Sequence, residues 1–170
     1  MLRPAQRYEE ELNSKWIRCW YNPDYLFYGD IGQGLIDVAE DNFNVHQFVS
    51  VDERGQVIGY ISYNINWNAK SASQLGVVSF EKGNLKFCRD IVQAIDDIFG
   101  KYHLNRLEWL CYVGNPAIRS YRNFIKRYGG RECGYFRQAA MLQDGTLHDC
   151  VAFEILAEEF SRRKGVKVRT

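Results

Sequence analysis

Charged residues that could bind ligands are concentrated in two blocks of the sequence. Residues 1–53 carry ten acidic side chains against four basic ones, whereas residues 115–131 carry five basic side chains and no acidic one. Arg122 and Lys126 are four residues apart and share one face of a predicted helix, as Arg119 and Arg122 do at a spacing of three. Such a basic helix attracts anionic ligands and an acidic segment attracts cations. An ordinary solvated surface is the alternative interpretation.

The thiol and imidazole groups show no metal-binding or redox pattern. The cysteines are odd in number and widely spaced, with no Cys-x-x-Cys motif and no alternation with histidine at zinc-ligand spacing. We therefore expect no metal site and reduced thiols of the cytosolic kind. These cysteines are Cys19, Cys88, Cys111, Cys133 and Cys150. His148, next to Asp149, could act as a base, but a single hairpin histidine is more often structural.

The composition is that of one folded domain covering residues 1–170. Hydrophobic residues make up 46% and charged residues 25% of the 170 positions. The net charge of +1 is far below that of a dedicated nucleic-acid binder. No apolar run approaches the roughly 20 residues that span a bilayer, and the N-terminus lacks the apolar core of a secretory signal. We expect a cytoplasmic protein that binds neither nucleic acid nor membrane.

Hydrophobic periodicity predicts one helix and three strands in the first half of the chain. The helix covers residues 7–20, where apolar side chains recur every four positions, and residues 24–44 are interpreted as loop and short helix. The elements that follow are a hairpin of strands at 45–51 and 57–65, a polar loop at 66–73 and a third strand, buried on both faces, at 74–80.

The second half alternates helices with strands. The predicted elements are a helix at 86–100, a buried strand at 106–113, a helix from Asn115-Pro116 to about Tyr128, and a hairpin of strands at 136–142 and 147–156 around an Asp-Gly turn, followed by a polar tail. A strand–helix–strand crossover runs through residues 75–113. The predicted fold class is therefore α/β, a mixed sheet flanked by helices.

An ordered series of short motifs runs through residues 57–160. Upstream are Ile58-Gly59-Tyr60, Leu75-Gly76 and residues 104–109, and downstream are Asn115-Pro116, Ala117-Ile118-Arg119-x-Tyr121, Gly129-Gly130, Glu132-x-Gly134, Arg137-x-Ala139, Asp144-Gly145 and His148-Asp149. Their order and spacing resemble the GNAT superfamily of N-acetyltransferases, closest to the branch similar to ribosomal-protein N-terminal acetyltransferases. The resemblance is weak before residue 57, where that family chooses its acceptor.

The resemblance implies a cofactor, acetyl-CoA, and a way of binding it. In that family two parallel strands, here 74–80 and 106–113, splay apart at their C-terminal ends. The pantetheine lies in the gap and bonds to free backbone groups, here those of Val77, Val78 and Ser79. The acceptor, an amine on a protein N-terminus or a small molecule, attacks the thioester directly from the other side.

The resemblance also assigns catalytic roles. Tyr121 falls on the tyrosine that protonates the departing CoA sulfur, and a phenol has a pKa close enough to that of a thiol for this role. Asn115 falls where a family asparagine contacts the cofactor. Their alternatives are a core tyrosine and a helix cap. For the general base the nearest acids are Glu81 and Glu108, with Ser79 or water as alternatives.

The predicted pyrophosphate loop departs from the family pattern. Small residues normally let backbone N–H groups approach the phosphates at a helix N-terminus. Here the matching residues are Lys82, Gly83, Asn84, Leu85, Lys86 and Phe87. Leu85 and Phe87 stand in place of two glycines, so either these side chains pack away from the phosphates or basic side chains compensate. Arg119 and Arg122 are expected near the CoA phosphates.

The leading hypothesis is an acetyl-CoA-dependent N-acetyltransferase. The alternative is a GNAT-like domain that has lost acetyl transfer and serves as a binding module, and a third option is a nucleic-acid accessory protein that uses the basic helix and the C-terminal tail. A homodimer is compatible with the sequence. The aromatic residues that could form the wall of an acceptor pocket are Trp16, Trp20, Tyr25, Phe27, Tyr28 and Trp67.

Overall fold

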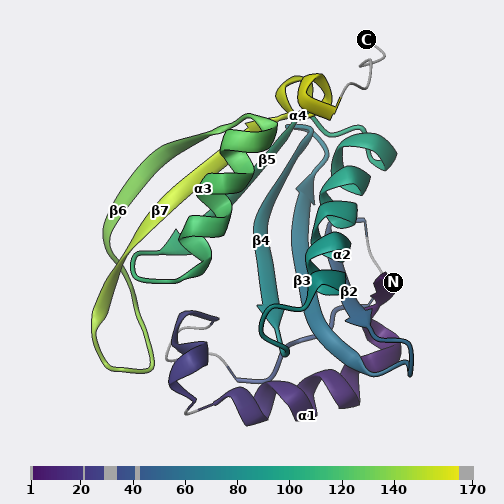
Figure 1. Cartoon of the computed structure of the whole chain (residues 1–170), viewed down its shortest axis with the longest axis vertical. Coiled ribbons are helices and arrows are strands. Elements are labelled where there is room, and N and C mark those ends of the chain that lie inside the picture. Colours follow the sequence, from purple (N-terminus) through teal and green to yellow (C-terminus); the bar gives the residue numbers. More distant parts are fainter. Residues whose placement is uncertain (1, 21, 29–33, 41–42, 165–170) are drawn as a thin grey trace.

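A mixed seven-stranded sheet organises the chain (Figure 1). The structure, a computed structural model, describes residues 2–20, 22–28, 34–40 and 43–164. The strand order is β1-β2-β3-β4-β5-β7-β6, and the α/β fold class predicted from the sequence is confirmed. The strands are β1 (Leu2–Pro4), β2 (Val45–Val51), β3 (Val57–Asn66), β4 (Ser71–Ser79), β5 (Arg106–Tyr112), β6 (Arg131–Met141) and β7 (Leu147–Leu156).

Helices cover both faces of this sheet. Figure 1 shows α2 and α3 in front of the strands and α1 across the bottom of the view. The helical elements are η1 (Ala5–Tyr8), α1 (Glu9–Cys19), η2 (Pro23–Tyr28), α2 (Leu85–Asp96), the π-helical turn η3 (Asp97–Lys101), α3 (Ala117–Tyr128) and α4 (Ala157–Lys164). None of the helices in the described ranges is long and apolar enough to cross a membrane.

Strands β4 and β5 are parallel neighbours that separate early. They pair only at Ser71 with Arg106 and Ala72 with Leu107, while the other neighbouring strands are antiparallel. A bulge follows at once, because the β3–β4 register shifts between Ser62 and Asn64. Bulges bend a strand and increase its twist, so β4 turns away from β5 toward its C-terminal end. This divergence was implied by the family resemblance.

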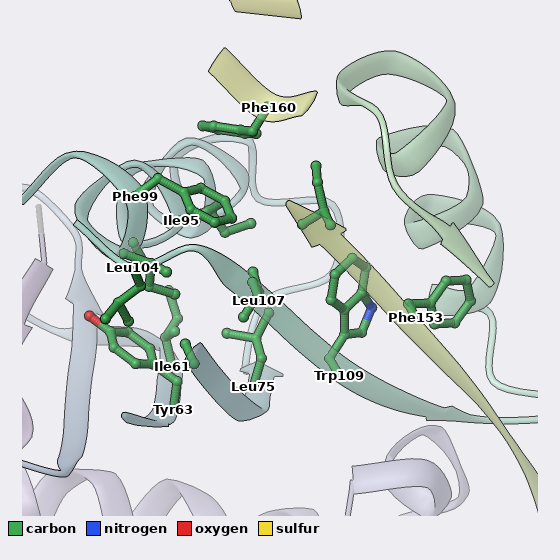
Figure 2. Packing of buried hydrophobic residues seen from close by; sticks show 14 of the residues in the cluster. Ile61, Tyr63, Leu75, Ile95, Phe99, Leu104, Leu107, Trp109, Phe153 and Phe160 are labelled. Carbon is green, nitrogen blue, oxygen red and sulfur yellow. The ribbon is translucent and has the colours of Figure 1, made fainter. Parts of the chain in front are cut away.

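The main core fills the space between the sheet and α2, α3 and α4. Figure 2 shows Trp109 of β5 beside Phe153 of β7, and their rings stack with centroids 5.4 Å apart. Phe160 of α4 closes the upper end against Phe99, with ring centroids 5.1 Å apart. Because a closely packed core tolerates little change of volume, this cluster fixes the position of α3 on β5.

A second apolar cluster attaches α1 to the opposite face of the sheet. Leu12, Trp16 and Cys19 of α1 are buried against a group of side chains that includes Val49 of β2 and Tyr60 of β3. The apolar spacing of four that predicted this helix is therefore its packing face. The two clusters lie on opposite faces, so a passage between β4 and β5 connects the α1 face with the α3 face.

Several expectations about the elements were wrong. Strand β6 starts at Arg131, five residues before the predicted strand, and β4 is not buried on both faces, because Gln74 is exposed. Residues 66–73 are not all loop, because Ser71 and Ala72 are buried and start β4 by pairing with β5. Strand β5 is not buried throughout, since Leu110 is 59% exposed. Residues 157–164 form a helix rather than a polar tail, because the single aromatic side chain of Phe160 seals the core. The rest of that basic tail lies outside the described residues.

Candidate active site between the splayed strands

A cavity of about 490 Å³ opens where β4 and β5 diverge. On the α1 face its lining includes Trp16, Asp37 and Tyr60, and on the α3 face it includes Asn115 and Tyr121. The strands between them contribute residues 75–78 and 110–112. The cavity therefore has one end on each face of the sheet, which lets two reactants approach one point from opposite sides.

Tyr121 lies at the α3 end of this cavity. Its ring packs against the stacked rings of Trp109 and Phe153, at centroid distances of 5.8 and 5.9 Å. Burial raises the pKa of the hydroxyl well above its ordinary value, and Cys111 and Tyr28 add to the rise. The phenol therefore keeps its proton at neutral pH and is a weaker acid than the sequence argument assumed, because burial moves its pKa further from that of a thiol. Packing of the ring fixes the position of its oxygen.

Asn115 lines the cavity and also caps helix α3. Its Oδ1 accepts a hydrogen bond of 2.9 Å from the backbone N–H of Ala117. This bond uses the side-chain oxygen and leaves the amide NH₂ as the group that can donate to a ligand. The capping interpretation and the cofactor interpretation of this residue are thus compatible.

Cys111 is a cavity residue that the motif comparison did not select. It lies on β5 with Tyr112 at the cavity wall, and burial raises the pKa of its thiol to about 12. The thiol is then protonated at pH 7, so a buried cysteine of this kind is a poor nucleophile. The alternation of β5 residues, with odd numbers toward α3, was the only sequence signal for its position.

The acids predicted as general base lie outside this cavity. Glu81 accepts a 2.6 Å hydrogen bond from the side chain of Asn84 at the start of α2. Glu108 is ion-paired with Arg106 at 3.0 Å and lines an adjoining pocket of the α1 face, which shares Leu75 and Leu110 with the cavity. Neither carboxylate is brought together with Tyr121.

The predicted backbone contacts on β4 lie at the cavity, but part of them is already occupied. Val77 and Val78 line it. The backbone of Ser79 is hydrogen-bonded to the hydroxyl of Tyr28 in η2. The side-chain hydroxyl of Ser79 donates to the carbonyl of Glu81 at 2.6 Å. Segment η2 therefore covers the end of β4, and Figure 1 shows it below α3.

At the start of α2, Leu85 and Phe87, which stand in place of two glycines of the family pattern, differ in their surroundings. Phe87 is buried against Gly59 of β3, where a Cβ would collide with its ring. Leu85 is 72% exposed. Gly83 has φ of +71°, a conformation that favours glycine. The backbone therefore turns through a glycine and enters α2 with neither of these two side chains packed over its first turn.

The polar groups of this loop have partners in the protein. The side chain of Asn84 caps α2 by accepting from the N–H of Phe87 at 3.0 Å. Lys86 bonds to Asp90 at 2.6 Å and to Ser50 at 3.3 Å, and Lys82 is paired with Asp24 of η2 at 2.6 Å. Of the two lysines, only Lys82 is largely exposed and free to turn toward a phosphate.

The basic face of α3 is partly neutralised. Arg122 forms two bonds with Glu132 of β6, at 2.6 and 3.3 Å. Arg119 is exposed one turn before it. The local excess of positive charge seen in the sequence is thus smaller in the folded protein.

The aromatic candidates for an acceptor wall divide into three groups. Trp16, Phe27 and Tyr28 line the cavity. Trp20 and Tyr25 pack against the second cluster. Trp67 lies in the β3–β4 hairpin, edge-on to Tyr102 at 6.3 Å.

Comparison with known proteins gives structural neighbours only. No protein-family model matches the sequence, and no curated protein matches it. A mutant form of the spermidine N-acetyltransferase SpeG from Vibrio cholerae superposes with a TM-score of 0.71 at 20% identity, covering 96% of this chain and 99% of that one. The chain has the GNAT fold.

Two further neighbours agree with this assignment. A GCN5-related N-acetyltransferase from Brucella melitensis has a TM-score of 0.69 at 19% identity over 96% of this chain and 78% of its own. A probable acetyltransferase has a TM-score of 0.59 at 24% identity over 69% of this chain and 64% of its own, slightly less than two thirds of that protein. These neighbours support the GNAT fold and do not single out the ribosomal-protein branch.

Proposed function

We propose that the protein is an acetyl-CoA-dependent N-acetyltransferase that transfers acetyl to a primary amine by direct attack. The observation that carries the proposal is the cavity through the β4–β5 gap, open to both faces of the sheet and lined by Tyr121. The acetyl-CoA thioester would enter from the α2–α3 side and the amine from the α1 side. The GNAT fold of the neighbours supports the same reaction.

The residues that would hold acetyl-CoA fit its chemistry in part. Backbone groups of Val77 and Val78 border the gap and suit the amides of pantetheine. The free N–H groups at the start of α2 and the positive end of its dipole suit the pyrophosphate. Lys82 would supply charge after leaving Asp24. Glu81 stands close to that helix start and opposes an anion there.

In the proposed step the neutral amine nitrogen forms a bond to the acetyl carbonyl carbon. The carbon–sulfur bond then breaks, and the sulfur leaves as a thiolate that the Tyr121 hydroxyl protonates. Solvent takes the proton released by the ammonium, since Glu81 and Glu108 have other partners, and it restores the proton of Tyr121. A covalent acetyl-cysteine is disfavoured because burial keeps the pKa of Cys111 at about 12.

The acceptor would be an amine on a protein N-terminus or on a small molecule. One neighbour is a spermidine N-acetyltransferase, and small polyamines are therefore the first small molecules to test. A protein N-terminus would have to reach the same α1 end of the cavity. We place the protein in the cytoplasm, where acetyl-CoA is available.

Self-association is part of the proposal. A SpeG neighbour is described as dodecameric. In this chain the edge strand β6 is exposed along nearly all of its length, and an open edge of that kind is a ready surface for pairing with another chain.

The alternative function, a binding module without acetyl transfer, is favoured by one observation. The start of α2 is already capped by Asn84, and Asn84 in turn is bonded to Glu81. A phosphate would have to displace or tolerate this arrangement. Measuring acetyl-CoA binding separates the two functions.

The proposal is tested by following CoA thiol release with acetyl-CoA and a panel of amines. Turnover with at least one amine is expected, and Tyr121→Phe should lower kcat by about 10²–10⁴-fold, the usual contribution of a general acid, with acetyl-CoA affinity nearly unchanged. The matched control is Tyr102→Phe, which removes a hydroxyl outside the cavity lining and should leave the rate unchanged. A wild-type rate in Tyr121→Phe would remove Tyr121 from the mechanism.

A further inference from the structure

The α1 end of the cavity carries one charged side chain among the described residues that line it, the carboxylate of Asp37. No lysine, arginine or histidine is found in that described lining. The other ionisable groups in the lining of the whole cavity are tyrosine hydroxyls and one thiol, which are neutral at pH 7. They belong to Tyr28, Tyr60, Tyr112, Tyr121 and Cys111. The cavity is therefore negatively charged at the end remote from Tyr121.

The backbone around Asp37 has no regular secondary structure, yet two side-chain amides hold it in place. Asn13 of α1 accepts from the N–H of Ile36 at 2.8 Å and donates to its carbonyl at 3.1 Å. Gln47 of β2 donates to the carbonyl of Asp37 at 2.7 Å and accepts from the N–H of Ala39 at 2.8 Å. These four hydrogen bonds fix the backbone on either side of Asp37, and none of them involves its carboxylate.

The surroundings of the carboxylate suit a cation. Its neighbour Tyr60 is 6% exposed, and the hydroxyl of Tyr60 accepts from Gln47 at 2.8 Å. Burial is the main cause of the raised pKa of this hydroxyl, and the charge of Asp37 adds to the rise, which places the two groups within electrostatic reach. Asp37 itself is exposed and forms no ion pair with the described residues. An incoming ammonium would thus meet a carboxylate that does not first have to break another pair.

We infer that Asp37 is the residue that selects a cationic acceptor, because its carboxylate binds the ammonium group of the amine at the α1 end of the cavity. This inference rests on the proposed acetyl transfer and adds to it the residue that distinguishes amines from neutral acceptors such as alcohols. Asp37 is a binding and specificity residue, and Tyr121 remains the group that acts on the sulfur.

The pairing has a consequence for pH dependence. A carboxylate that favours the charged amine raises the pKa of the bound amine. A tenfold preference for the ammonium over the neutral amine equals a rise of about one unit in that pKa. Removing the carboxylate should therefore weaken amine binding and, at the same time, move the pH midpoint of kcat to lower pH.

The experiment compares Asp37→Asn with Glu53→Gln, a control that removes one negative charge from the exposed β2–β3 turn. Binding of n-butylamine and of n-butanol is measured by ligand-observed NMR at pH 7. We expect Asp37→Asn to weaken n-butylamine binding three- to tenfold, with n-butanol binding unchanged and Glu53→Gln like the wild type. Equal n-butylamine affinity in Asp37→Asn and the wild type, or no n-butylamine binding in either, would overturn the inference.

A kinetic arm uses n-butylamine as acceptor, with acetyl-CoA at saturation. Asp37→Asn should raise KM three- to tenfold and shift the pH midpoint of kcat downward by about 0.5 to 1 unit, on the order set by the charge pairing. A fall in kcat with unchanged KM and midpoint would show a structural role instead and contradict the inference. Thermal melting of both variants verifies that they fold.

The two proposals fail in distinguishable ways. Absence of acetyl-CoA binding by calorimetry would remove acetyl transfer, while n-butylamine binding that depends on Asp37 would still establish the cation site. Acetyl-CoA binding together with n-butylamine binding that ignores Asp37 would remove this inference alone.

Discussion

Gly59→Ala tests how helix α2 is positioned on the sheet. A Cβ at position 59 would lie within 2.6 Å of Cδ2 and Cζ of the Phe87 ring, about 1 Å inside the ordinary contact distance of roughly 3.5–4.0 Å. Phe87 is 2% exposed and has no open side to which it can retreat. Overpacking a core in this way costs about 1–3 kcal/mol, and we expect the upper half of that range.

The assay is urea denaturation followed by circular dichroism and tryptophan fluorescence. A loss of about 2–3 kcal/mol corresponds to a fall in Tm of roughly 4–12 °C for a chain of this size. Gly100→Ala is the matched control, since a Cβ there meets no atom within 4 Å, and it should change stability by less than about 0.5 kcal/mol.

A double variant tests whether the cost of Gly59→Ala comes from its contact with the Phe87 ring. In Phe87→Leu the ring is gone, so adding Gly59→Ala should cost less than about 1 kcal/mol, and the two substitutions should be strongly non-additive. Wild-type stability in Gly59→Ala, or simple additivity in the double variant, would refute the packing of Phe87 on Gly59. It would also remove the reason why Phe87 stays clear of the start of α2.

Three further predictions concern η2, α4 and the cavity thiol. Asp24→Asn releases Lys82 from its 2.6 Å ion pair and should tighten acetyl-CoA binding two- to fivefold in calorimetry, in keeping with the small energy of exposed pairs; an unchanged Kd would show that Lys82 does not reach the phosphates. Phe160→Ala empties a site that is 3% exposed and should lower the free energy of unfolding by about 3–5 kcal/mol in urea, whereas a loss below about 1 kcal/mol would mean that α4 does not seal the core. Cys111, with a pKa of about 12, should resist iodoacetamide at pH 8 in the native protein while exposed Cys88 reacts; rapid labelling of Cys111, located by peptide mass spectrometry, would contradict its burial.

Local sequence patterns predicted those elements whose hydrophobic period reflects their burial. The strands at 45–51 and 147–156 were located to the residue because their alternating apolar side chains pack into the two clusters. The start of β4 was missed because Ser71 and Ala72 are small and lie between β3 and β5, the latter more than 30 residues away in the sequence. Helix α4 was missed because Phe160 alone supplies most of its contact with the core.

Site residues could be predicted from the order of motifs along the chain. They could not be predicted where the face of the sheet to which a side chain points decides whether it reaches the cavity. Tyr121 and Asn115 follow a strand end and a helix start, and both line the cavity. Glu108 is equally close in sequence, but an even position on β5 directs it to the other face. Asp37 lies in an irregular segment that Asn13 and Gln47 fix through long-range hydrogen bonds, and no local pattern encodes such bonds.

The central claim is that the gap between β4 and β5 binds acetyl-CoA. A crystal structure of the protein with CoA tests it most directly. We predict pantetheine between Val77 and Leu110, the sulfur beside the Tyr121 hydroxyl, and the pyrophosphate at the start of α2 with Lys82 turned away from Asp24. CoA bound elsewhere, or Tyr28 still bonded to Ser79 over the end of β4 at millimolar CoA, would contradict it.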